Sequence, residues 1–146
     1  MTRAGALIET LRGRVAVGDC DYGGRMKVDA YVARISDATL TLGLTIGFTA
    51  EYIAAKRCGL VTLHQDIAYL GELEAGDLLV MLGGVLSVDC EQILLLHHML
   101  RIEDGAAVLT AKVLMRGIHL EHRTSVALDA PILARARQLL IREADT

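Results

Sequence analysis

Residues 18–32 of this 146-residue chain read GDCDYGGRMKVDAYV. The stretch joins an apolar, strand-like run over residues 14–17 (RVAV) to a run with helical spacing over residues 26–38 (MKVDAYVARISDA). Two aspartates, Asp19 and Asp21, stand at the junction beside a pair of glycines. This order predicts carboxylates at the start of a helix, where aspartates either cap the helix or take part in chemistry.

The helix predicted from this run extends over residues 27–43. Tyr31, Ile35, Ala38 and Leu42 recur at spacings of four, three and four, which is the period of an apolar helical stripe. Few charged residues interrupt the run. We therefore expect this helix to be buried on most of its sides.

Four strand-like runs follow, separated by the turn-like sequences EAGD and EDGA. Because no helical pattern lies between them, they predict an antiparallel sheet and an α+β fold. One long helix against about five strands is the content of a sheet wrapped around a central helix. The four runs cover residues 60–73, 77–89, 92–104 and 106–120, and an earlier strand is expected over residues 12–17.

The remaining segments give weaker patterns. Residues 3–10 fit a short helix or an ordered arm, and residues 39–47 (TLTLGLTIG) fit either a helix or a strand. Residues 50–59 predict a short helix. Asp129 and Pro131 predict the start of a C-terminal helix, with the aspartate as its cap and the proline in its first turn.

The composition is globular, at 53% hydrophobic and 3% aromatic residues, and predicts one domain over residues 1–146. A net charge of −3 argues against a nucleic-acid partner. No run of ~18 apolar residues lacks a charge, so we expect neither a membrane span nor a signal peptide. The three separated cysteines favour a reducing cytoplasm over a disulfide framework or a cysteine zinc site.

The opening stretch resembles the signature of the hotdog-fold acyl-CoA thioesterases of the 4-hydroxybenzoyl-CoA thioesterase type. That signature is a strand ending in D-x-D, a glycine, a hydrophobic position and a tyrosine near the first helical turn. DYGGRMKVDAYV is also similar to the DYNGHMN-type openings of a bacterial branch that includes thioesterases acting on betainyl- and carnitine-derived CoA esters. LVTLHQDIAYLGELEAGDLL resembles that branch's second strand and turn. The matching signature positions are Asp19, Asp21, Gly24, Met26 and Tyr31.

The resemblance implies a hotdog fold that self-associates as a dimer or tetramer and acts on an acyl-CoA thioester. Coenzyme A would enter only as part of the substrate, with no separate cofactor and no metal. Asp21 would be the catalytic carboxylate, as nucleophile or as general base on water, and the backbone N–H near Val28 would bind the thioester oxygen. The residues expected at the substrate pocket are Gly24, Met26, Tyr31 and His64, of which Met26 and Tyr31 also fit a core role.

This chemistry suits a strand, turn and helix. The first turn of a helix has unpaired N–H groups and a partial positive charge, and each donor aimed at a developing oxyanion lowers the barrier by roughly 3 kcal/mol. A carboxylate just before the helix can attack the thioester carbon or deprotonate a water molecule. A thiolate leaves readily, so a strong general acid is not essential.

Other ionisable residues have competing interpretations. Asp19 fits a structural role, and Asp37 is the second-choice acid because another hotdog branch uses a carboxylate on this helix. His64 stands where the similar branch often has a glutamate, so it either orients water in the pocket or is an ordinary strand histidine. His97 and His98 are adjacent on a strand and point to opposite faces, so they cannot bind one metal together.

Two positions depart from the similar branch, since Gly23 replaces its asparagine and Arg25 its histidine. If those side chains shape the branch's site, the substrate here differs. The alternative function is a non-catalytic hotdog module that binds an acyl-CoA or an acyl chain. A hotdog dehydratase combines a histidine with an acid on the helix, and the helix predicted here contains no histidine.

Overall fold

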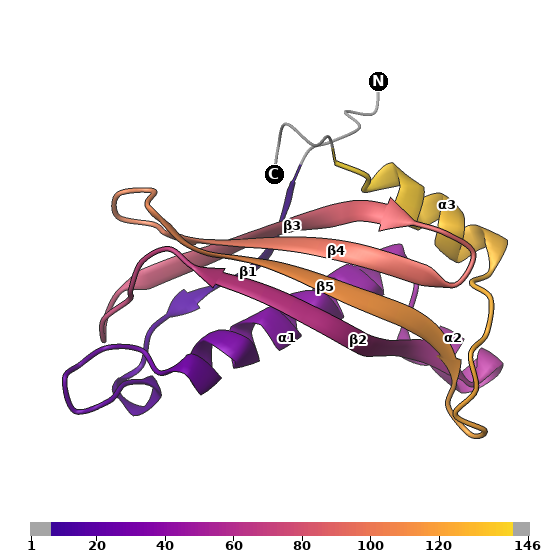
Figure 1. Cartoon of the computed structure of the whole chain (residues 1–146), viewed down its shortest axis with the longest axis horizontal. Helices are drawn as coiled ribbons and strands as arrows, with labels where there is room; N and C mark the ends of the chain where they lie inside the picture. Colours follow the sequence, from indigo (N-terminus) through magenta and orange to yellow (C-terminus); the bar gives the residue numbers. More distant parts are fainter. Residues whose placement is uncertain (1–6, 142–146) are drawn as a thin grey trace.

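The computed structural model describes residues 7–141 and is shown in Figure 1. Five strands and three α-helices make up these residues, and a short 3-10 turn precedes the first helix. The elements in chain order are β1 (Ile8–Arg14), the 3-10 turn Val17–Asp19, α1 (Val28–Ile46), α2 (Ala50–Lys56), β2 (Cys58–Tyr69), β3 (Leu78–Val88), β4 (Gln92–Arg101), β5 (Ala107–His119) and α3 (Ala130–Gln138).

The five strands form one antiparallel sheet in the order β1-β3-β4-β5-β2. Helix α1 lies across one face of this sheet (Figure 1). The predicted α+β fold, with about five antiparallel strands around one long helix, is confirmed. The order leaves β2 at one edge, where its outer backbone groups have no strand beside them in the described chain.

Helix α1 and the sheet share one hydrophobic core. The predicted stripe on the helix is buried, and Ile35, Ala38 and Leu42 are all completely excluded from solvent. Alternate residues of the strands, among them Met81 and Leu95, point from the sheet into the same core. Full burial of an Ile or Leu side chain stabilises the fold by about 1.5–3 kcal/mol, so this stripe fixes the position of α1.

The outer side of α1 is more exposed than predicted. Val28, Leu40 and Leu44 are 63%, 69% and 56% exposed, so the expectation of a helix buried on most sides is wrong for the single chain. The physical reason is that the sheet covers one side of the helix, and α3 contributes packing only near its C-terminal end.

Two predicted boundaries are wrong at the N-terminal side of the core. Strand β1 starts at Ile8, so residues 8–10 are extended, although a helix or arm was predicted over residues 3–10; residues 3–6 lie outside the described residues. The strand also ends at Arg14. Val15 is buried, but Val17 has turned into the 3-10 segment and is 80% exposed.

Helix α1 continues through the ambiguous stretch 39–47 and ends at Gly47. The buried stripe extends to Ile46, which favours helix over strand, and Gly47 at φ 118° supplies the left-handed cap. The next helix, α2, ends earlier than predicted because Arg57 takes the left-handed cap conformation, at φ 56°. Residues 58 and 59 already belong to β2.

Helix α3 starts after Asp129 with Pro131 in its first turn, as predicted. The Asp129 carboxylate does not cap the helix. It accepts a hydrogen bond from the Tyr52 hydroxyl at 2.6 Å instead, which connects α2 to α3.

Among the described residues, no single helix is long and apolar enough to span a membrane. The consecutive helices α1 and α2 reach that length and composition only together, across a bend of 72°.

Candidate active site

The loop between the 3-10 turn and α1 holds Asp21 in a fixed orientation. Its Oδ1 atom accepts the backbone N–H groups of Gly23 at 2.9 Å and Arg25 at 3.1 Å. The Asp21 backbone closes the same loop, because its carbonyl accepts from Gly24 and its N–H donates to Arg25. The side chain is exposed, and Oδ2 has no hydrogen-bond partner among residues 7–141. One carboxylate oxygen therefore holds the loop and the other faces solvent.

The two glycines of the loop have different functions. Gly24 adopts φ +82°, a conformation that favours glycine, and so allows the chain to reverse. A Cβ atom at Gly23 would lie 3.1 Å from Oδ1 of Asp21. The glycine that replaces the asparagine of the similar branch therefore leaves room beside the carboxylate.

Asp19 has a structural role in this loop, as expected. Its Oδ2 atom accepts the Ala16 N–H at 3.2 Å and an Arg34 guanidinium N–H at 3.0 Å. The backbone bond to Ala16, followed by the Arg34 bond, lowers the pKa of the Asp19 carboxyl. Asp19 thus fastens the loop to α1, and its oxygen is engaged in these bonds.

Helix α1 begins at Val28, directly after this loop. No hydrogen bond from the Val28 backbone N–H is present among residues 7–141, and its side chain is exposed. An unpaired first-turn N–H carries part of the positive end of the helix dipole. The solvent-facing carboxylate and the unpaired helical N–H thus lie only seven residues apart in sequence, with no helix or strand between them.

The Asp21 loop is held by the loop between β2 and β3. The Met26 N–H donates to the Leu73 carbonyl at 2.9 Å, and the Ala75 N–H donates to the Gly24 carbonyl at 3.1 Å. The Leu73 N–H in turn donates to the Tyr31 hydroxyl at 2.9 Å. These contacts join segments that are more than forty residues apart in sequence.

Met26 and Tyr31 belong to the hydrophobic core. They are 6% and 4% exposed, and the Tyr31 ring packs edge-on against Tyr69 at 5.6 Å between centroids. Burial raises the pKa of the Tyr31 hydroxyl. Of the expected pocket residues, Gly24 therefore shapes the loop, while Met26 and Tyr31 support the loop through their hydrogen bonds to Leu73.

The structure does not bring His64 or Asp37 to Asp21 within one chain. His64 pairs with Leu114 on β5, next to Val113, which faces the α1 core, so His64 lies on the opposite sheet face. It is exposed there. Asp37 is exposed on α1, and nine residues of helix place it about 14 Å along the axis from Val28.

His97 and His98 point to opposite sheet faces, as predicted. His97 is completely buried on the α1 side, where Nε2 lies 3.0 Å from the Thr39 hydroxyl, and His98 pairs with Thr110 at 3.0 Å. No group of three or more His, Cys, Asp or Glu side chains within residues 7–141 is arranged to hold a metal ion.

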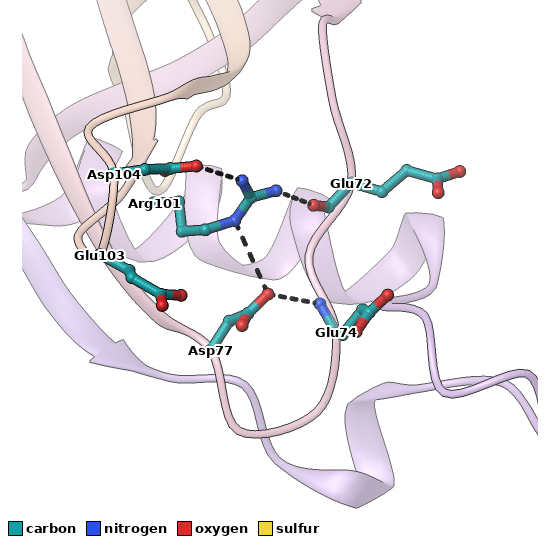
Figure 2. Close-up of a pocket in the computed structure, with 6 residues that line it drawn as sticks. All are labelled: Glu72, Glu74, Asp77, Arg101, Glu103 and Asp104. Carbon is teal, nitrogen blue, oxygen red and sulfur yellow. Dashed lines mark hydrogen bonds and ion pairs between the residues drawn. The ribbon is translucent and has the colours of Figure 1, made fainter.

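An acidic cavity of about 320 Å³ lies beside the β2–β3 loop and was not found from the sequence. Figure 2 shows Arg101 at its centre, bonded to Asp104 at 2.9 Å and to the Glu72 carbonyl at 2.6 Å, and 3.8 Å from Asp77. The Ala106 N–H and Arg101 lower the pKa of Asp104. Because Arg101 contacts oxygens of Asp104, Glu72 and Asp77, the cluster stabilises the β2–β3 loop, which carries Leu73.

Comparisons with known proteins agree with this geometry. A model of the thioesterase-like superfamily matches residues 15–136. A curated relative from Agrobacterium fabrum, L-carnitine dehydrogenase/betainyl-CoA thioesterase, is 34% identical over 119 residues. That alignment covers 82% of this chain and 24% of the relative, so the chain spans about a quarter of the relative's length.

Solved structures share the fold. A hypothetical protein from Staphylococcus aureus in complex with CoA is 22% identical with a TM-score of 0.84, covering 93% of this chain and 87% of that one. An aspartate-to-asparagine mutant of 4-hydroxybenzoyl-CoA thioesterase in complex with 4-hydroxybenzoyl CoA is 13% identical with a TM-score of 0.80, covering 89% and 98%.

The five-stranded sheet wrapped around α1 is the hotdog fold, which acyl-CoA thioesterases share. The chain belongs to the thioesterase-like superfamily, whose model matches residues 15–136.

Proposed function

We propose that this chain hydrolyses an acyl-CoA thioester, with Asp21 as nucleophile or general base and the Val28 N–H as oxyanion donor. The observation that carries the proposal is that the two oxygens of the Asp21 carboxylate have different environments. Oδ1 is bound by two backbone N–H groups, and Oδ2 is free of partners in the described chain and faces solvent. The second oxygen is therefore available to a substrate or to a water molecule.

The chemistry follows from this arrangement. Oδ2 attacks the thioester carbon, or removes a proton from a water molecule that attacks it. Negative charge then develops on the carbonyl oxygen, and the unpaired N–H at the start of α1 is the donor that stabilises it. The CoA thiolate leaves with the bonding electron pair. In the nucleophile route this leaves a mixed anhydride between the acyl group and Asp21, which a water molecule then hydrolyses; in the general-base route the water oxygen is already bonded to the acyl carbon. Both routes release the carboxylic acid and regenerate the Asp21 carboxylate.

The acyl group is proposed to be small or medium in size. The Agrobacterium relative carries the name of a betainyl-CoA thioesterase, and it is the basis for testing betainyl-CoA first. Coenzyme A is proposed as the other half of the substrate, since a solved structure of the same fold contains CoA.

Self-association is the second part of the proposal. Val28, Leu40 and Leu44 are exposed on α1, and Leu40 lines a cavity together with Leu60 and Thr62 of the edge strand β2. This gives one chain an apolar surface that a second copy can cover. A dimer or a tetramer is expected, in a cytoplasmic setting.

The test is CoA release from betainyl-CoA and from a panel of short, branched, aromatic and medium-chain acyl-CoAs. Asp21→Asn should lower kcat by about 100-fold or more, the scale of a positioned acid–base group. Asp37→Asn is the matched control on the neighbouring helix and should retain activity. Activity that survives Asp21→Asn but disappears in Asp37→Asn would transfer the chemistry to α1. Binding of acyl-CoA without release by any variant would favour the non-catalytic module.

A further inference from the structure

Two adjoining cavities lie between α1 and β2, away from Asp21. The first, of about 290 Å³, has a mixed polar and apolar lining, and the second, of about 200 Å³, is mainly apolar. Thr39, Leu40, Leu60 and Met115 line both. No charged side chain lines either cavity within the described chain. The first cavity is further lined by Ser36, Thr62 and Gln65.

Thr39 differs from the other threonines of α1. The hydroxyls of Thr41 and Thr45 donate to backbone carbonyls four residues earlier, at 3.2 and 2.8 Å, which is the usual partner of a helical threonine. Among residues 7–141, Thr39 makes no such bond. Its hydroxyl lies 3.0 Å from Nε2 of His97 instead, at the wall shared by the two cavities.

His97 orients this hydroxyl. The ring is completely buried. Gly83 lies opposite it, and a Cβ atom at that position would be only 3.3 Å from Nδ1, so the glycine leaves space for the ring. Nδ1 has no hydrogen-bond partner in the described chain. A proton on Nδ1 would thus be a buried donor without an acceptor, so the tautomer that carries its proton on Nε2 is favoured. That tautomer donates to Thr39, which leaves the Thr39 proton free to donate into the cavity.

The cavities lie in line with the proposed reaction centre. Helix α1 and β2 run side by side in opposite directions, since Tyr31 packs on Tyr69 at one end and the Thr39 cavity contains Leu60 at the other. Thr39 is eleven residues after Val28, which places it about 16 Å further along the helix axis. An extended acyl chain with its thioester at Val28 would therefore reach the cavities with its far end.

We infer that Thr39, positioned by His97, is a specificity-determining donor for acyl-CoAs whose chain ends in a neutral hydrogen-bond acceptor, such as a terminal hydroxyl. The inference rests on the proposed function, because it takes the thioester to lie at Val28. The apolar walls suit the methylene chain, and the Thr39 proton suits an acceptor at its end. A terminal carboxylate is disfavoured, because the cavities supply no cation to offset its desolvation.

The experiment compares matched pairs of substrates. Values of kcat/KM are measured for octanoyl- and dodecanoyl-CoA and for their terminally hydroxylated counterparts, with wild type, Thr39→Val and Thr39→Ser. At dodecanoyl length, wild type and Thr39→Ser should prefer the hydroxylated substrate, and Thr39→Val should lose that preference by about ten-fold, the scale of one buried hydrogen bond. The octanoyl pair is too short to reach the cavities and should show no such change.

The positioning role of His97 is tested with His97→Leu, which should lose the preference as Thr39→Val does. If that variant does not fold, the Thr39 pair still decides the inference. A purely structural role of Thr39 would lower kcat/KM for both members of each pair by the same factor, and this result would overturn the inference.

Dissociation constants of the matching S-dodecyl-CoA thioethers, with and without a terminal hydroxyl, separate the two proposals. Hydrolysis without any hydroxyl preference would overturn the inference and keep the proposed function. A Thr39-dependent binding preference without hydrolysis would keep the inferred donor and overturn the proposed catalysis.

Discussion

The backbone N–H of Leu73 donates to the Tyr31 hydroxyl at 2.9 Å, and both residues are buried. Through this one bond, helix α1 holds the loop whose Leu73 carbonyl accepts the Met26 N–H at the end of the Asp21 loop. The Asp21 loop is thus supported by residues that are themselves buried.

Tyr31→Phe should destabilise the fold, because it leaves the buried Leu73 N–H without its acceptor. The expected loss is about 1–3 kcal/mol in the free energy of unfolding, measured by urea denaturation. Tyr69→Phe is the matched control, since Tyr69 is 45% exposed. Equal stability of the two variants would show that water or a shifted carbonyl replaces the Tyr31 hydroxyl.

Buried His97 makes stability depend on pH. Burial, with a smaller contribution from His98, lowers the pKa of His97 from 6.5 to about 4. Between these values the unfolded chain binds a proton that the folded chain does not, so the free energy of unfolding falls as the pH is lowered from 6.5 toward 4. The expected loss is about 2 kcal/mol between pH 7 and pH 5, measured by urea denaturation at both values.

His97→Gln should flatten this dependence, although its stability at pH 7 is lower. His64→Gln removes one exposed histidine and serves as the matched control. The explanation fails if wild type and His97→Gln lose the same free energy between the two pH values.

Tyr52→Phe should loosen α3. The Tyr52 hydroxyl donates to Asp129 at 2.6 Å, and burial together with this bond raises the pKa of the phenol, so it stays protonated. We expect a loss of about 1–2 kcal/mol, as for a hydrogen bond to a charged group that is partly open to water. The urea midpoint is compared with that of Tyr22→Phe, whose ring is fully exposed. Identical midpoints would show that the contact contributes nothing.

Leu44→Glu tests self-association. Leu44 is 56% exposed on α1, and a carboxylate there would be buried without a partner in an assembly that covers this face. Light scattering coupled to size-exclusion chromatography should show a dimer or tetramer for wild type and a smaller species for Leu44→Glu. Val17→Glu, on the 3-10 turn, is the control. A wild-type monomer at micromolar concentration would refute the self-association proposal.

Much of the fold follows from local sequence. The spacing of Ile35, Ala38 and Leu42 predicts the buried side of α1, and the turn sequences separate the strands correctly. The outer face of the helix was predicted less well, because a periodic pattern identifies the buried stripe and carries no information on which other element covers the remaining sides.

His64 shows why the sheet face on which a side chain lies is harder to predict than the strand itself. A bulge at residue 63 separates Thr62 from His64 in the pairing of β2 with β5. One extra residue moves every later side chain to the other face, so Gln65 and Thr62 share the cavity and His64 does not. The bonds of Met26 and Leu73 were missed for a related reason, since backbone pairing across forty residues leaves no local pattern.

The clamped Asp21 carboxylate also has an entropic consequence. With Oδ1 bound by two backbone N–H groups, rotation that exchanges the two oxygens is hindered in the folded loop. Under the proposed mechanism, the conformational entropy of choosing the reacting oxygen is therefore lost when the chain folds, and not in each turnover. If Asp21 acts as the nucleophile and water attacks the aspartyl carbon of the anhydride, label from water should enter only one of the two carboxylate oxygens; a general-base role predicts no label in Asp21.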